Sequence, residues 1–233
     1  MGSYFTWEGF LKAAPQVLQY LPVTLKVTFL SLAIATLLGV LVAAARVYRI
    51  PLLCTFCKGY LHLMRGIPYV VLLLLIYYFL PFLVWKLFAV DINGWDKLVF
   101  AIITFSVHEG AYIGEIFRSA IESVPKVQKE AAYSVGLNEA QTFWRILLPQ
   151  SVKVAIPAYG ANLVELFQNT TITFVIGAMD FIGRANTVGG ATFHYLEPYL
   201  FVAIVYVIIS ILLETFFRFL DTQYHFGAKL KFR

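Results

Sequence analysis

The stretch KEAAYSVGLNEAQTFWRILLPQ, residues 129–150, is polar and charged in a chain that is otherwise strongly apolar. It carries four charged side chains, a glycine at position 136 and a proline at position 149. Irregular polar backbone is not tolerated against lipid. The stretch therefore predicts an ordered connection that lies outside a bilayer, between two membrane-spanning segments.

The composition supports a polytopic membrane protein. Of the 233 residues, 60% are hydrophobic and 13% are charged, whereas soluble domains are about 45–50% apolar and about 25% charged. The net charge of +5 is not gathered on a soluble basic face, so we expect no nucleic-acid partner. Cys54 and Cys57 lack the further ligands of a zinc site, and we interpret them as small apolar helix residues.

Five apolar stretches approach the length of about 20 residues that a membrane helix needs. They are 21–45, 66–85, 98–121, 154–176 and 199–213, the last extending to about residue 220. A helical approach from Cys54 is expected to lead into the second. The sequence predicts an all-α fold with five transmembrane helices, in one membrane domain at 21–220 followed by a tail at 221–233.

Two features fix the expected orientation. Thirteen of the 18 lysine and arginine residues lie in the first and third connections and the C-terminal segment, against five on the other side. Because cytoplasmic connections carry the excess of basic residues, we expect a cytoplasmic C-terminus and, with five spans, an outside N-terminus.

Residues 1–20 are aromatic-rich and weakly amphipathic, which predicts a helix along the outer interface, with a disordered lead-in as the alternative.

The polar connection divides into two predicted short helices, which together span 126–149. The first starts near Pro125 and is ended by Gly136, whose backbone is free to adopt a positive φ. Asn138 is a suitable cap for the second, with Gln141 as its reciprocal partner. The second is expected to run to about Leu148, where Pro149 starts the next span, and to have an apolar face holding Phe143, Trp144 and Leu147.

The spacing of this connection resembles the cytoplasmic EAA motif of permease subunits of ATP-binding-cassette importers. The matching positions are Glu130, Ala131, Ala132, Gly136, Ile146, Leu148 and Pro149. RGIPYVVLLLLIYY at 65–78, GAYIGEIFRSAIESVPKVQKEAA at 110–132 and FQNTTITFVIG at 167–177 are similar to the branch that takes up polar amino acids. The resemblance runs from about Thr24 to Phe219.

The resemblance implies the ABC importer permease fold and a set of partners. These are a second permease subunit in a homodimer or heterodimer, two cytoplasmic ATPase subunits and an extracytoplasmic substrate-binding protein, in the cell membrane of a prokaryote. The polar connection would couple the permease to the ATPase. Because the chain has no G-x-x-x-x-G-K-[ST] motif, we expect no catalytic residue, metal or cofactor on it, with ATP and magnesium on the ATPase.

Polar side chains within the predicted spans indicate a transport pathway, because charges there cost about 2.5–3.5 kcal/mol and face a cavity or a partner. By helical spacing, His108, Tyr112, Glu115 and Ser119 share one face, with Glu109 about a quarter-turn away. Asn162, Glu165, Asn169 and Thr173 share another. The predicted pathway residues are Glu165, Asn162, Asn169, Thr173, His108, Glu109 and Tyr112.

The alternative for each of these groups is structural pairing, such as Glu115 with Arg118 or a neighbouring helix. The family more often has a small residue at position 165, and lysine and aspartate at 168 and 169. This departure leaves Glu165 without an obvious counter-ion and predicts a ligand with an ammonium or other cation. We favour a cationic or polar amino acid, with cystine and glutamine still open.

A second class of function stays open at this point. The adjacent His108 and Glu109 would also suit a proton-coupled secondary carrier of small polar solutes, or an intramembrane enzyme, although H-E without H-E-x-x-H is weak support for the latter. Secondary carriers normally show internal repeats, and none is evident here. A co-purifying ATPase distinguishes the importer from the carrier.

Overall fold

The computed structural model describes residues 5–225, and the regular structure in that part of the chain is entirely helical. The all-α prediction is therefore confirmed. The elements are α1 (Trp7–Leu18), α2 (Leu21–Val47), α3 (Pro51–Gly66), α4 (Tyr69–Phe88), α5 (Lys97–Glu122), α6 (Lys126–Ser134), α7 (Glu139–Thr142), a π-helical turn η1 (Phe143–Leu147), α8 (Leu148–Asn169), a 3-10 segment η2 (Thr170–Ile176), α9 (Phe181–Thr192) and α10 (Leu196–His225).

Within the described residues, four helices are long and apolar enough to cross a membrane: α2, α4, α5 and α10. They correspond to four of the five predicted spans. The remaining one falls on α8, whose 22 residues give about 33 Å, also enough to cross a bilayer. Its polar side chains lower its hydropathy, so the predicted count of five spans is approximate.

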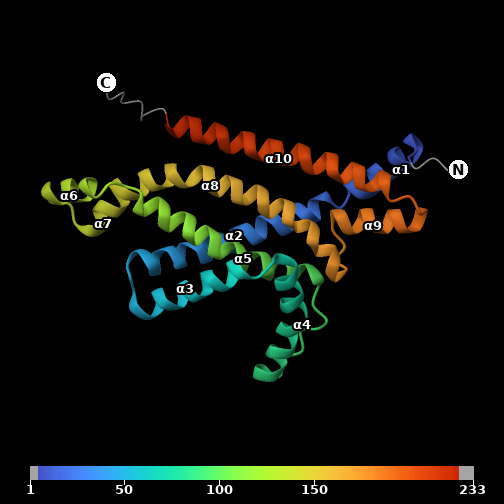
Figure 1. Ribbon diagram of the computed structural model, residues 1–233, viewed down its shortest axis with the longest axis horizontal. Helices are drawn as coiled ribbons and strands as arrows, with labels where there is room; N and C mark the ends of the chain where they lie inside the picture. Colours follow the sequence, from blue (N-terminus) through green and yellow to red (C-terminus); the bar gives the residue numbers. More distant parts are fainter. Residues whose placement is uncertain (1–4, 226–233) are drawn as a thin grey trace.

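The expected helical approach from Cys54 to the second span is present as α3, but a break separates it from α4. Helix α3 ends at Gly66, Ile67 is extended with φ −101° and ψ 123°, and α4 starts after Pro68. A proline ring disfavours helical geometry in the residue before it, so the chain breaks there. Helix α4 then leaves the bundle at a steep angle (Figure 1).

Helices α2 and α5 form the most extensive pairing in the molecule. Their backbones approach closely at Gly39 and Gly114, which we call the α2–α5 seam. A Cβ at Gly39 would lie 2.6 Å from Ile113 Cγ2, and one at Gly114 would lie 2.7 Å from Val42 Cγ1. Small residues allow this approach between membrane helices, whose association depends on van der Waals contact rather than on the hydrophobic effect.

Helix α10 covers α8 along its length and packs against α1 and α9 at one end. The lead-in is helical, as one of the two alternatives predicted, and it is anchored where the Thr6 backbone N–H donates to the buried Glu197 carboxylate at 3.0 Å. Its place at the membrane interface stays a prediction. The tail was expected from residue 221, but α10 continues to His225, and 226–233 lie outside the described residues.

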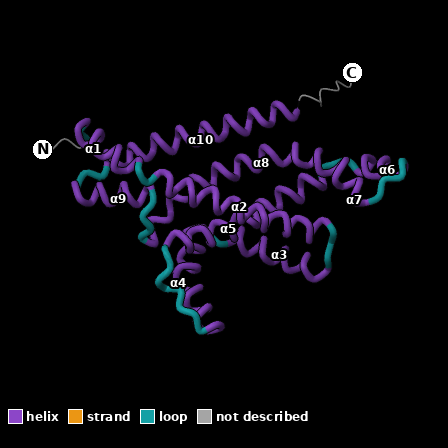
Figure 2. Tube along the Cα trace, turned by 180° about the vertical axis from the view of Figure 1, so that it is seen from behind, coloured by secondary structure: helices purple, strands orange, loops and turns teal. Residues whose placement is uncertain are grey.

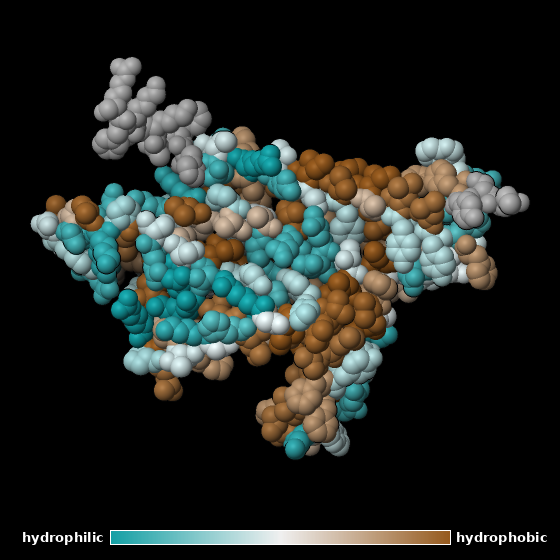
Figure 3. Space-filling view, viewed as in Figure 1, coloured by the Kyte–Doolittle hydropathy of each residue, from teal (hydrophilic) through white to brown (hydrophobic). Residues whose placement is uncertain are grey.

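The two ends of the bundle differ in character. Helices α6 and α7, the α2–α3 connection and the C-terminal end of α10 lie at one end, and α1 lies at the other (Figures 1 and 2). Hydrophilic side chains gather over the end with α3, α6 and α7, whereas α4 and much of α10 present hydrophobic ones (Figure 3). The first and third connections and the C-terminal end of α10 therefore lie at one common end of the bundle.

Candidate functional site

The polar connection folds into a small projection, which we call the α6–α7 knob (residues 126–149). Helix α6 begins after Pro125, as predicted. It ends at Gly136, which has φ +83°, with Gly136 N–H donating to Tyr133 O at 2.9 Å and Leu137 N–H to Ala132 O at 3.1 Å. This pair of hydrogen bonds is a Schellman motif. It requires the left-handed conformation that glycine adopts without strain.

The second half of the knob is only partly as predicted. Asn138 and Gln141 form the expected capping box. Helix α7 then stops at Thr142 instead of running to Leu148, because the Leu148 N–H donates to Phe143 O and closes a π-helical turn. Helix α8 follows without a break, with Pro149 in its first turn, where a missing N–H does no harm.

The side chains of the knob separate into buried and exposed sets. Ala132 is buried, and Phe143, Ile146, Leu147 and Leu148 are half-buried. Of the three residues predicted to share an apolar face, Phe143 and Leu147 are half-buried, whereas Trp144 is 67% exposed. The extra residue of the π-helical turn changes the register of that face.

The outward surface of the knob combines apolar groups with one free acid. Val127, Tyr133, Val135 and Trp144 are all exposed; we call them the exposed loop face. Glu130 is exposed as well and makes no ion pair within residues 5–225. The other knob carboxylate, Glu139, lies 3.9 Å from Lys129. Apolar side chains held in water around a free charge are the usual surface of a protein contact.

Three predicted pathway residues of α5 and α8 meet Tyr69 of α4 in a buried polar cluster: His108, Glu109 and Asn162. Asn162 donates to Glu109 Oε2 at 2.5 Å, and His108 Nδ1 lies 3.6 Å from Glu109 Oε1. Four polar atoms of the cluster, one in each residue, have no hydrogen-bond partner within residues 5–225. Buried polar atoms without partners carry a large desolvation cost, so this is a place where a further polar group would be stabilised.

Aromatic rings enclose this cluster. The ring centroids of Tyr69 and His108 are 3.7 Å apart. The Tyr112 ring also stacks on His108, with 4.9 Å between the ring centroids. The guanidinium of Arg65 lies 5.5 Å from the Tyr112 ring centroid. Tyr112 is thus brought to the cluster as predicted, through its ring rather than its hydroxyl.

The predicted polar face of the fourth span does not continue beyond Asn169. Helix α8 ends there, and Thr173 lies on the 3-10 segment η2, where its buried hydroxyl donates to Thr170 O at 2.8 Å. Asn169 is half-buried and Glu165 is exposed in the single chain. Because the helix changes pitch, a 3.6-residue period could not place all four on one side.

Glu165 lines a separate recess between α8 and α10. The recess has a volume of about 450 Å³, and Gln168, Glu214 and Arg218 also line it. No ion pair to Glu165 occurs among the described residues. Its predicted lack of an internal counter-ion therefore agrees with the structure, while its part in a transport pathway stays a prediction.

Glu115 has the structural role that was weighed against a pathway role. Its carboxylate accepts hydrogen bonds from Arg118 on the same helix and from Arg46 on α2. Arg118 also pairs with Glu122. These contacts tie α2 to α5 beside the knob.

Sequence reasoning missed Tyr69 and Arg46, which belong to these two groups. Tyr69 follows a proline at the start of α4 and is indistinguishable in sequence from the other tyrosines of that helix. Arg46 directly follows the predicted span 21–45 and was counted only as a charge for orientation. Both contacts depend on which helices pack together, which a single sequence does not show.

Three comparisons bear on the family. Residues 6–225 match the model of the family described as "Binding-protein-dependent transport system inner membrane component". The L-cystine transport system permease protein TcyL of Bacillus subtilis (strain 168) is 38% identical over 204 residues, covering 88% of this chain and 85% of that protein. The glutamate/aspartate import permease protein GltK of Escherichia coli O157:H7 is 31% identical over 207 residues, covering 89% and 92%.

A solved structure titled as an amino acid ABC transporter with histidines superposes with a TM-score of 0.83 and 27% identity, over 94% of this chain and 99% of that one. The MetNI methionine ABC transporter in an inward-facing conformation shares the fold, with a TM-score of 0.67 and 18% identity over 94% and 99%. The resemblance seen in the EAA motif is thereby confirmed along the described chain. This protein belongs to the family of binding-protein-dependent transport system inner membrane components, the permease subunits of ABC importers.

Proposed function

We propose that this chain forms the translocation pathway of an ATP-driven amino acid importer and is driven by a separate ATPase through the α6–α7 knob. The relatives that support the substrate class include permeases named for cystine and for glutamate and aspartate. ATP and magnesium would bind on the ATPase. A second permease subunit and an extracytoplasmic binding protein complete the proposed assembly, with the N-terminus outside and the C-terminus in the cytoplasm.

The observation that carries the coupling proposal is the shape of the knob. Its two helices are held at a fixed angle by the Schellman motif at Gly136 and the capping box at Asn138. It continues through η1 into α8, so displacement of the knob is transmitted directly to that helix. Its exposed loop face and free Glu130 provide the contact for the ATPase, and Glu130, Ala131, Ala132, Gly136, Ile146, Leu148 and Pro149 form its framework.

Reconstitution with the cognate ATPase and binding protein tests the coupling. Glu130→Lys reverses the charge of the knob's unpaired acid, so we expect ATP-driven uptake to fall by on the order of tenfold or more, while the variant still inserts and remains folded. Glu139→Lys is the matched control, because Glu139 is equally acidic and exposed but faces Lys129. Equal uptake by the two variants would exclude Glu130 from the docking contact, and uptake without any ATPase would favour the secondary carrier.

We further propose that the substrate's cationic group is met by acidic side chains on α8 and α5. Glu165 is the exposed one, and Asn162, Asn169, Thr173, His108, Glu109 and Tyr112 are the other predicted pathway residues. The support is the absence of a counter-ion for Glu165 among the described residues and the unmet hydrogen bonds of the buried polar cluster. A cationic amino acid would supply the counter-ion for Glu165, and the polar groups of a cationic or polar amino acid would supply hydrogen-bond partners for the cluster.

Vesicles reconstituted with the cognate ATPase and binding protein also test this pathway. Glu165→Gln keeps the side-chain volume and removes the charge, so uptake of a cationic amino acid should fall by on the order of tenfold or more, since a charge left without its partner is costly. Binding of the substrate to the isolated binding protein should not change. Glu214→Gln, on the other wall of the recess, is the control. Unchanged uptake of every amino acid by the Glu165 variant would return Glu165 to a structural role.

A further inference from the structure

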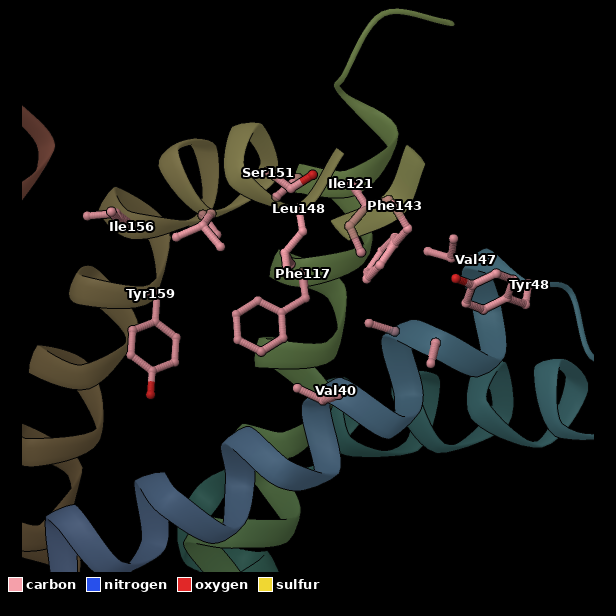
Figure 4. A pocket seen from close by; sticks show the side chains of 15 residues that line it. Val40, Val47, Tyr48, Phe117, Ile121, Phe143, Leu148, Ser151, Ile156 and Tyr159 are labelled. Atoms are coloured by element: carbon pink, nitrogen blue, oxygen red, sulfur yellow. The ribbon is translucent and has the colours of Figure 1, made fainter. Parts of the chain in front are cut away.

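A partly open apolar cavity lies where α2, α5 and the start of α8 meet, directly beneath the knob. We call it the loop-end cavity, and its volume is about 370 Å³. Phe117, Phe143 and Tyr159 point into the same space from α5, η1 and α8 (Figure 4). The other lining residues are Val40, Ala43, Ala44, Val47, Tyr48, Ala120, Ile121, Leu148, Ser151, Val152, Ala155 and Ile156.

The lining offers almost nothing to a polar ligand. The hydroxyl of Ser151 donates to Leu147 O at 2.8 Å, and that of Tyr159 shares a hydrogen bond with Thr36 at 2.8 Å. These two hydroxyls are therefore already engaged within the protein, and the third hydroxyl of the lining belongs to Tyr48, whose side chain is exposed. An amino acid zwitterion would be left with two unpaired charges here, and a cavity of this kind is also unfavourable for water. The loop-end cavity is thus suited to a hydrocarbon chain and is distinct from the proposed pathway.

Three basic residues lie close in the chain to residues that line the cavity. Arg49 follows Tyr48, Lys153 follows Val152, and Arg145 lies two residues after Phe143, so each backbone is within about 4–7 Å of a lining residue. All three are exposed, and none of them is in an ion pair within residues 5–225.

Among the described acids at this end of the bundle, Glu130 on the knob is unpaired, and three others are engaged elsewhere. Glu115 and Glu122 pair with arginines of α2 and α5, and Glu139 faces Lys129. The rim of the cavity is therefore left with an excess of positive charge. A basic rim next to an apolar slot between membrane helices is the combination that holds an anionic lipid.

We propose that the loop-end cavity binds one acyl chain of an anionic phospholipid, with the headgroup held by Arg49, Arg145 and Lys153. The bilayer supplies this occupant at the depth where the cavity opens, and the rim selects it by charge. Phe143 and Leu148 line the cavity and belong to the knob, so the bound chain contacts the segment that joins α7 to α8. The bound lipid is therefore in contact with the knob and lies between it and helices α2 and α5.

Native mass spectrometry of the full chain in detergent tests this proposal with phosphatidylglycerol and phosphatidylcholine of identical chains. We expect phosphatidylglycerol to bind more tightly, by on the order of fivefold for each rim cation. Replacing Arg49, Arg145 and Lys153 together by glutamine should abolish the preference. The control replaces three basic residues of the opposite end, Lys26, Lys86 and Lys97, by glutamine and should keep it. Equal affinity of the wild type for both lipids would overturn the charged rim.

A second pair of variants tests the cavity itself. Ala155→Leu fills it from α8, where Ala155 is 8% exposed, and should weaken phosphatidylglycerol binding by on the order of tenfold, because the displaced methylene groups lose their burial. Ala158→Leu makes the same change on the exposed side of that helix and should have no effect. Equal binding by the two variants would place the lipid elsewhere. A cysteine at Val152 that forms a disulfide with a second copy would show that protein, not lipid, covers the cavity.

Discussion

The α2–α5 seam and the junction of the same two helices with α8 are packed in opposite ways. At the seam, Gly39 and Gly114 bring two backbones together so closely that a single Cβ on either would lie within 2.7 Å of an opposing side-chain atom. At the junction, fifteen residues surround a space of about 370 Å³. The comparison teaches that α2 and α5 behave as one body, whereas α8 and the knob attached to it can shift against that body.

The ion pairs strengthen this division. Arg46 and Arg118 both contact Glu115 at the end of the seam next to the knob, which adds a polar tie between α2 and α5. The described part of α8 has no corresponding ion pair to either helix. A helix that packs loosely against a rigid pair can adopt two discrete positions more readily than one that is tightly packed on all sides. Switching between two such positions turns a small local movement into a larger one.

The largest effect is expected where the seam is tightest. Gly39→Leu places a side chain where Ile113 Cγ2 is 2.6 Å from the new Cβ, and overpacking of this kind costs about 1–3 kcal/mol and often more when backbone must move. We expect a strong loss of folded protein, measured as a lower melting temperature and a smaller monodisperse peak in detergent. Gly59→Leu is the control, because nothing lies within 4 Å of its Cβ position. Equal stability of the two variants would contradict the rigid seam.

The smallest effect is expected at the junction. Phe143→Ala removes a ring that is already half-buried beside a cavity, so it should cost no more than about 1 kcal/mol. Phe105→Ala is the reference, because Phe105 is fully buried and such a change typically costs about 3–5 kcal/mol. Thermal unfolding of both variants sharpens the contrast. Similar losses of stability would mean that the ring at 143 is tightly packed and that the junction is not loose.

The parts of the fold set by local chemistry were predictable. Apolar runs located α2, α4, α5 and α10, and the glycine at 136 and the Asn138–Gln141 pair located both ends of the knob's turn. These features depend on residues near one another in sequence. The spacing of the EAA motif likewise predicted the family, since its positions lie within one connection.

The parts set by packing were not predictable. Helix α9 was missed because three of its twelve residues are glycines, which are poor helix formers; it is held by the Asp180 cap and by Phe181, which is fully buried. The 3-10 segment after Asn169 was read as a continuation of α8, although it ends at Gly177 with φ +70°. The ring contact between Tyr69 and His108 joins two helices whose packing the sequence does not reveal.

The π-helical turn at Phe143–Leu147 has a consequence for the direction in which the knob points. A π turn contains about one residue more than an α turn, and each residue of an α-helix corresponds to a rotation of about 100° and a rise of about 1.5 Å. The azimuth of α7 about the axis of α8 is therefore set by the number of residues in this turn. Removing one of the five would leave the knob at almost the same height and point the exposed loop face about a quarter of a revolution away from its present direction.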